Sequence, residues 1–143
     1  MALLERVQDD VKTALKAGER DRVNALRLIA DALQKATKEN GAEELEVLQR
    51  ERKRRLEAAE AYRGGGRAEL ADAEEREAEI ISAYMPEPIS DDELGAIVGD
   101  AVAQSGASSP KEMGRVMSMV MPQVKGRADG KRVSAAVQEK LNA

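Results

Sequence analysis

Residues 109–132 read SPKEMGRVMSMVMPQVKGRADGKR and contain a helix start, an apolar face, a proline stop and a basic turn. Ser109 and Glu112 have the spacing of a capping box, with Pro110 at the favoured first helical position. Apolar side chains then recur at helical spacing until Pro122, at Met113, Val116, Met117, Val120 and Met121. The segment predicts a short amphipathic helix followed by a glycine-punctuated turn.

The methionines of this helix allow two interpretations. Because Met repacks readily, the cluster could be an adaptable surface for a partner. Alternatively, the four-residue spacing of Met113, Met117 and Met121 places them on one face, where they would fill the core of a small three-helix unit. We favour the core interpretation, with Met119 off that face and exposed.

Two further helices are expected around this segment. Downstream, Asp129 can cap a helix whose apolar face is Val133, Ala136, Val137 and Leu141. Upstream, Ser90-Asp91-Asp92-Glu93 form a second capping box, which opens a helix that Gly106 closes.

The first 85 residues predict four longer helices, at about 2–17, 20–38, 42–62 and 67–84. The second of these carries two apolar stripes, so we expect it to be central. The breaks between these helices are Gly18, Asn40-Gly41 and Gly64-Gly65-Gly66. The expected apolar faces include Leu15 in the first helix, Leu56 in the third and Leu70 in the fourth.

The Met85-Pro86-Glu87-Pro88-Ile89 segment is the best boundary in the chain, because two prolines favour a stiff extended connector. No strand is expected, and aromatic residues make up only 1% of the composition. We predict an all-α protein. A bundle of about four helices (1–85) is joined by a proline linker (86–89) to a small three-helix domain (90–143).

Composition restricts the chemistry. The chain has no His and no Cys, which excludes thiolate or imidazole metal sites, a Cys nucleophile and a Ser-His-Asp triad. We therefore expect no catalytic residue, no metal and no cofactor. The sequence contains no long apolar run and no signal-peptide core, so the expectation is a cytoplasmic protein without membrane contact.

The basic turn is the leading candidate site. Residues 111–132 carry a net charge of +4, whereas the rest of the chain carries −8. Cations beside glycines at a helix N-terminus can approach phosphates closely, although the same pattern is typical of a solvated loop. The candidate nucleic-acid-binding residues are Lys125, Arg127, Lys131 and Arg132, with Lys111 and Arg115 as outlying support.

Other charged stretches favour ordinary surfaces. The basic run at Arg50–Arg55 has acidic residues at helical spacing, such as Glu46 with Arg50 and Glu51 with Arg55, which favours ion pairs. Glu74, Glu75, Glu77 and Glu79 indicate a solvated helix face. With only Tyr62 and Tyr84 as aromatics, stacking on single-stranded bases is not expected, and RNA contact would be to backbone shape.

The sequence resembles the YqeY family. The resemblance rests on LLERVQDDVKTALKAGERDRVNALRLI at 3–29, Ala83-Tyr84-Met85-Pro86, Lys111-Glu112-Met113-Gly114-Arg115-Val116-Met117, Met121-Pro122, and Lys125-Gly126-Arg127-Ala128-Asp129-Gly130. Two departures are mild: Met85 stands where the family usually has Leu, and the glycine run at 64–66 is richer. The C-terminal half is similar to the tail domain of GatB, a component of the glutamine-dependent aspartyl/glutamyl-tRNA amidotransferase.

The resemblance implies an all-helical, two-part fold and a place near tRNA-dependent amidotransferases. In those relatives the tail engages tRNA, while the kinase and amidase centres lie elsewhere. The resemblance therefore implies a tRNA-binding or adaptor module that is not catalytic alone, with carbon–nitrogen ligase activity (glutamine as amido donor) only as a family association. Two rivals are a protein–protein adaptor without RNA contact and a stand-alone amidotransferase.

Overall fold

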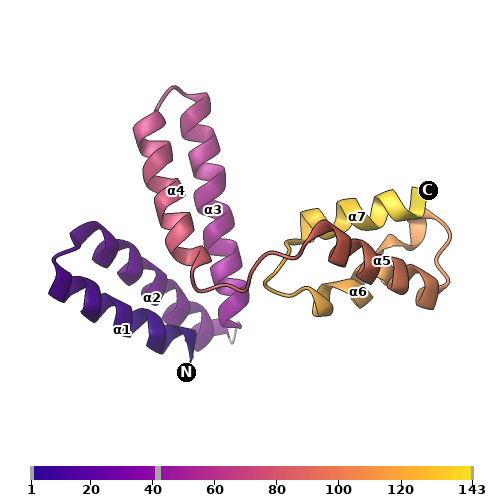
Figure 1. Cartoon of the computed structure of the whole chain (residues 1–143), viewed down its shortest axis with the longest axis horizontal. Coiled ribbons are helices and arrows are strands. Elements are labelled where there is room, and N and C mark those ends of the chain that lie inside the picture. The colour runs from indigo at the N-terminus through magenta and orange to yellow at the C-terminus, as the bar shows by residue number, and fades with distance from the viewer. Residues whose placement is uncertain (1, 41–42, 143) are drawn as a thin grey trace. The chain divides into compact units, whose positions relative to one another are not determined.

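The computed structural model describes residues 2–40 and 43–142. Within these ranges every regular element is helical and no strand is present, so the all-α prediction is confirmed. The chain forms two compact units, Met1–Met85 and Pro86–Ala143 (Figure 1). Gly41 and Ala42, where the sequence predicts a turn and the start of the third helix, lie outside the described residues.

The N-terminal unit consists of two helical hairpins. The first pairs α1 (Leu3–Ala17) with α2 (Arg20–Asn40), and the second pairs α3 (Glu44–Gly64) with α4 (Ala68–Ser82). Gly18 ends α1 in the left-handed region, at φ 73°, and its N–H caps the last carbonyls as the sequence predicts. The α1–α2 turn lies at the end of its hairpin away from α3 and α4 (Figure 1).

The core of this unit forms where the two hairpins meet. Val7 from α1, Leu48 from α3 and Ile81 from α4 are buried together with α2. Both predicted stripes of α2 contribute, and its buried residues are Val23, Ala25, Leu26, Ile29 and Leu33. The prediction that α2 is central is therefore confirmed.

Three leucines that the periodicity placed on apolar faces are exposed: Leu15 is 52% accessible, Leu56 39% and Leu70 43%. Along the α3–α4 hairpin the buried seam is made of alanines, Ala59, Ala71 and Ala78. Small side chains let the two helices approach closely, so the leucines beside the seam turn outward. In the last turns of α1 the buried position is taken by Ala14, and Leu15 next to it faces outward.

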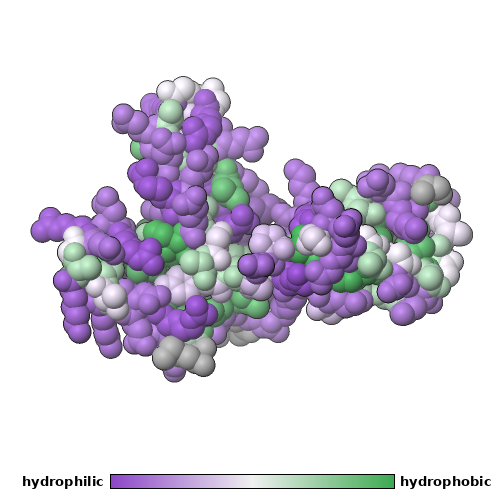
Figure 2. Space-filling model, in the orientation of Figure 1, coloured by the Kyte–Doolittle hydropathy of each residue, from purple (hydrophilic) through white to green (hydrophobic). Residues whose placement is uncertain are grey.

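Ion pairs join α3 to α4. Arg55 contacts Glu51 at 2.7 Å, as predicted, and also Glu77 of α4 at 3.1 Å. Near the Gly64 end, Arg63 contacts Asp72 and Glu75, each at 2.8 Å. The acidic face of α4, which we expected to be only solvated, thus supplies partners to α3. Figure 2 shows the hydrophilic surface of this hairpin.

Polar contacts link α1 to the ends of the α3–α4 hairpin. The Glu44 carboxylate accepts hydrogen bonds from the N–H groups of Leu3 and Leu4, at 3.2 and 2.8 Å, and so satisfies free donors at the start of α1. The Tyr84 hydroxyl donates to Asp10; burial and this carboxylate raise the pKa of Tyr84. Arg6 covers the Tyr84 ring at 5.4 Å, which leaves that ring unavailable for base stacking.

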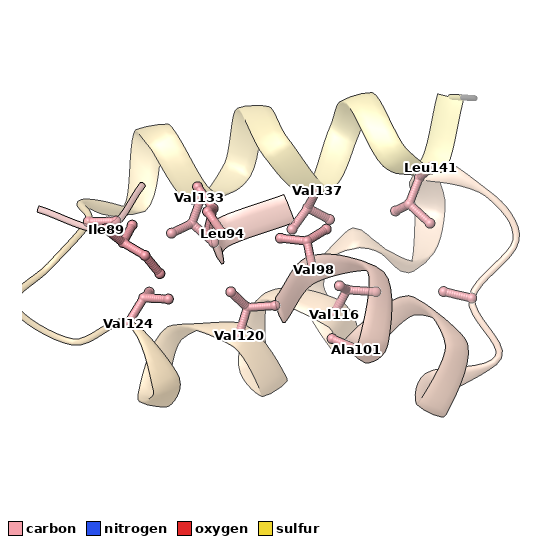
Figure 3. Close-up of a cluster of buried hydrophobic side chains, with 12 residues drawn as sticks. Ile89, Leu94, Val98, Ala101, Val116, Val120, Val124, Val133, Val137 and Leu141 are labelled. Carbon is pink, nitrogen blue, oxygen red and sulfur yellow. The ribbon is translucent and has the colours of Figure 1, made fainter. Parts of the chain in front are cut away.

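The C-terminal unit contains three helices, α5 (Asp91–Ser105), α6 (Met113–Val120) and α7 (Gly130–Asn142). Short 3₁₀ turns at Pro110–Glu112 and Met121–Gln123 flank α6. Figure 3 shows the buried cluster, in which Val116, Val120 and Val124 face α5 and α7. The helix starts predicted at Ser90, Ser109 and Asp129 are each observed.

The methionine prediction needs one correction. Val116, Val120 and Val124 occupy the centre of the core, whereas the methionines are half-buried around it. Met119, which we expected to be exposed, also packs against the cluster. The valines and the methionines Met113, Met117 and Met121 recur with the same four-residue spacing. Three closely packed helices leave room at the centre only for the smaller, β-branched valines.

Candidate nucleic-acid interface

The turn between α6 and α7 is held in place by its own backbone. The N–H groups of Arg127 and Ala128 donate to the Val124 carbonyl, at 2.8 and 3.2 Å. Gly126 has a φ of 77°, where a Cβ would be strained, and it is buried. Asp129 then caps α7, because its Oδ1 accepts the Arg132 N–H at 2.8 Å.

The linker contributes directly to this turn. The Ile89 N–H donates to the Arg127 carbonyl at 3.0 Å, and the Ile89 side chain is only 2% exposed, within the C-terminal core. Ile89 therefore packs as a residue of the C-terminal unit, although it follows two prolines that are themselves exposed.

The Arg127 guanidinium donates three hydrogen bonds to two residues, Glu93 and Glu87. Its two terminal nitrogens donate to the two carboxylate oxygens of Glu93, each at 2.9 Å, and its Nε donates to the Glu87 carbonyl at 3.2 Å. These hydrogen bonds lower the pKa of Glu93 below its ordinary value. The Ser90 capping box is consequently half-formed: Ser90 accepts from the Glu93 N–H, but the Glu93 carboxylate turns to Arg127.

The Glu93–Arg127 pair makes stability depend on pH. A carboxyl whose pKa is lower in the folded state stabilises the fold above its ordinary pKa of 4.5, and this contribution is lost as pH falls through the folded value. We expect Glu93→Gln to reduce the acid-induced decrease in the urea midpoint of the C-terminal unit, measured from amide signals between pH 7 and 3. Glu139→Gln is the control, and equal decreases in both variants would contradict the pairing. The urea midpoint of both variants should still fall somewhat in acid, because backbone N–H donors also lower the pKa of Glu112.

Arg132 has a weaker partner. Its guanidinium contacts Asp91 at 2.7 Å, and the Asp91 side chain is 97% exposed. An exposed ion pair of this kind contributes little and exchanges readily with other anions. Arg132 is thus already oriented at the surface, beside the start of α7.

The other two predicted cations of the turn are lysines. Lys131 is exposed on the first turn of α7, and Lys125 is half-buried beside Gly126. The structure therefore brings Lys125, Arg127, Lys131 and Arg132 to one end of the C-terminal unit. We call these four residues the turn cations.

Lys111 and Arg115 lie elsewhere. Lys111 lies in the 3₁₀ turn before α6 and Arg115 in the first turn of α6, whereas the turn cations follow the end of α6. The rise along the intervening segment places Lys111 about 15–20 Å from the turn. Arg115 contacts Glu112 at 2.5 Å, and Glu112 also accepts the N–H groups of Ser108 and Ser109. These two cations are not part of the turn's surface.

The acidic partners of the turn were not predicted from the sequence. Asp91 and Glu93 are 41 and 34 residues away from the arginines that they bind. Their only signal in the sequence is the run Asp91-Asp92-Glu93 at a helix start, which is equally typical of a favourable helix N-terminus. Asp91 and Glu93 partly neutralise the positive charge of the turn, so its potential is lower than its own residues alone would give.

Within residues 2–40 and 43–142, no cluster of three or more acidic side chains is suited to a metal ion. Among the same residues, no helix has both the length and the apolar character needed to cross a membrane.

The chain is similar to a known protein family and to a curated protein. The family model described as "Yqey-like protein" matches residues 4–141. A curated protein, "Altered inheritance of mitochondria protein 41, mitochondrial" from Pyrenophora tritici-repentis (strain Pt-1C-BFP), is 26% identical over 149 residues. That alignment covers 99% of this chain and 82% of the relative.

Proposed function

Since the chain belongs to the Yqey-like protein family, we propose that it is a non-catalytic module that binds folded tRNA through its C-terminal unit. The similarity of that unit to the tail domain of tRNA-dependent amidotransferases motivates the choice of RNA. Carbon–nitrogen ligase activity would then belong to a larger assembly, because in those enzymes the kinase and amidase centres lie outside the tail. We propose that the protein acts in the cytoplasm. The printed name of the relative assigns that other protein to mitochondria.

The observation that supports the proposal is the ordered turn with four cations around it. The backbone of residues 124–128 is fixed by hydrogen bonds, so a bound phosphate would not have to order a flexible loop. Lys131 and Arg132 stand on the first turn of a helix, where backbone N–H groups also favour anions. Regularly spaced phosphates of a folded RNA could replace Asp91 on Arg132.

Arg127 has a different role in this proposal. Three of its five N–H groups are already bound to Glu93 and Glu87, so it positions the turn and keeps two N–H groups for a phosphate. If all four turn cations were replaced together, a loss of tRNA affinity could come either from lost phosphate contacts or from a destabilised turn. Variants of Lys125 and Lys131 leave the hydrogen bonds of Arg127 to Glu93 in place, so they test RNA contact more directly.

A filter-binding titration of the full chain with a tRNA mixture tests the proposal. Binding is expected to weaken as salt rises, because neutralised phosphates release counterions. Absence of binding at low salt, or binding that does not depend on salt, would contradict the proposed phosphate contacts.

A change at Asp91 tests whether Arg132 takes part. Asp91→Asn frees the guanidinium, so tRNA affinity is expected to rise about two- to fivefold, the equivalent of one exposed ion pair. Asp92→Asn makes the same charge change next to it, and no ion pair of Asp92 is seen within the described ranges. If the two variants bind tRNA equally, Arg132 is not a phosphate contact.

A further inference from the structure

A groove opens at the α1–α2 turn of the N-terminal unit. It has a volume of about 350 Å³ and is lined by Ala14, Leu15, Gly18, Glu19, Arg20, Val23, Asn24 and Arg27. Ala14 and Val23 are buried side chains of the core, whereas Leu15 is half-exposed. The groove thus has an aliphatic floor with one large apolar side chain left partly in water.

The charges on the rim are unbalanced. Glu19 is paired with Arg22 at 3.9 Å, which offsets its charge. Arg20 and Arg27, one on either side of Asn24 on α2, have no ion-pair partner within residues 2–40 and 43–142. Arg55, Arg63 and Arg127 each bind a carboxylate, so the two rim arginines differ from the arginines that stabilise this fold.

We infer that this groove docks an acidic peptide segment of a partner protein, with a leucine-sized side chain inserted against Leu15. The apolar side chain would cover the exposed part of Leu15, where burial of aliphatic area is favourable, whereas Ala14 and Val23 are already buried. Flanking carboxylates would bind Arg20 and Arg27, whose planar groups match a carboxylate with two parallel hydrogen bonds. This surface is independent of the proposed tRNA contact.

A nucleic acid fits the groove less well. None of the eight lining residues is aromatic, so a base has no ring to stack on. A phosphate would bind the arginines but would leave Leu15 exposed. The combination of an aliphatic floor and a cationic rim favours a peptide that is both acidic and apolar.

The test uses the full ¹⁵N-labelled chain and a capped peptide, Glu-Glu-Leu-Glu-Glu. Saturable chemical-shift changes are expected at amides of residues 14–27, with millimolar affinity for so short a peptide, and they should weaken with salt. Peptides with Ala in place of Leu, or with Lys in place of Glu, are expected to bind at least about tenfold more weakly.

Two variants separate the site from the rest of the surface. Arg20→Gln with Arg27→Gln is expected to weaken the Glu-Glu-Leu-Glu-Glu peptide by about tenfold or more. Arg67→Gln with Arg76→Gln removes two exposed arginines outside the groove and should leave affinity unchanged. All four positions are exposed, and unchanged amide spectra of the free variants verify folding.

Four results would overturn the inference. They are no shifts with the acidic peptide, equal shifts with the lysine peptide, equal weakening in both arginine double variants, and groove amides that respond to tRNA but not to peptide.

Discussion

Replacing Ile89 with alanine is expected to destabilise the C-terminal unit by about 2–5 kcal/mol, the range for truncating a buried Ile to Ala. The residue looks like part of a connector, since it follows Pro86-Glu87-Pro88. Its side chain is nevertheless buried in the same cluster as Leu94, Val124 and Val133, and the truncation would leave a cavity there (Figure 3). Its N–H also holds the turn through the Arg127 carbonyl.

Hydrogen exchange measures the loss of stability within the C-terminal unit itself. Both tyrosines lie in the first 85 residues, so aromatic signals would not report on α5–α7. Protection of the Val98, Val120 and Val137 amides is expected to fall by about 30-fold or more, since each 1.4 kcal/mol is tenfold. Pro88→Ala is the control, because Pro88 is exposed. Equal protection in the Ile89 and Pro88 variants would show that Ile89 is only a connector.

Most of the fold could be predicted from local signals. Helix starts at Ser90, Ser109 and Asp129, and the stop at Gly18, depend on the chemistry of a few neighbouring residues, and the structure shows each of them. Apolar spacing also located every helix, because the period of a helix is set by its own backbone. These features do not require knowledge of which helix packs on which.

The choice among apolar side chains could not be predicted in the same way. The series Met113–Met117–Met121 and Val116–Val120–Val124 have the same spacing, and only the approach of α5 and α7 decides which one is central. Leu56 and Leu70 are outside the core because alanines form the seam between α3 and α4. Helix–helix distance is a tertiary property, and periodicity carries no information about it.

The position of the basic turn before a helix was predicted from the sequence, but its charge balance was not. The turn from Lys125 to Arg132 is a structured feature at a helix start, as expected, whereas Lys111 and Arg115 lie at the opposite end of α6. Arg127 binds Glu93 and Arg132 binds Asp91, and both carboxylates are distant in sequence from the turn. Local charge counting cannot include such partners, so it overestimated the field at the turn.

The proposed tRNA contact predicts a large effect of charge reversal at the turn lysines. Lys125→Glu with Lys131→Glu is expected to weaken tRNA binding by on the order of 100-fold at 0.1 M salt, since each lost phosphate contact removes about one unit of the log–log salt slope. Lys111→Glu is expected to have a smaller effect, because this residue lies away from the turn.

Lys12→Glu with Lys53→Glu is the matched control. Both lysines are exposed in the N-terminal unit, and the variant has the same net charge as the turn variant. The two variants therefore differ in the position of the reversed charges and not in net charge, so a difference in tRNA affinity reports on that position. Lys131→Glu alone covers the case in which the half-buried Lys125 is needed for folding.

The decisive measurement is the salt dependence of tRNA affinity for the wild type, the Lys125/Lys131 variant and the Lys12/Lys53 control in one filter-binding series. Phosphate contacts by the turn lysines predict a slope lower by about 2 for the turn variant and an unchanged slope for the control. Equal slopes for all three proteins would contradict tRNA recognition by the turn between α6 and α7.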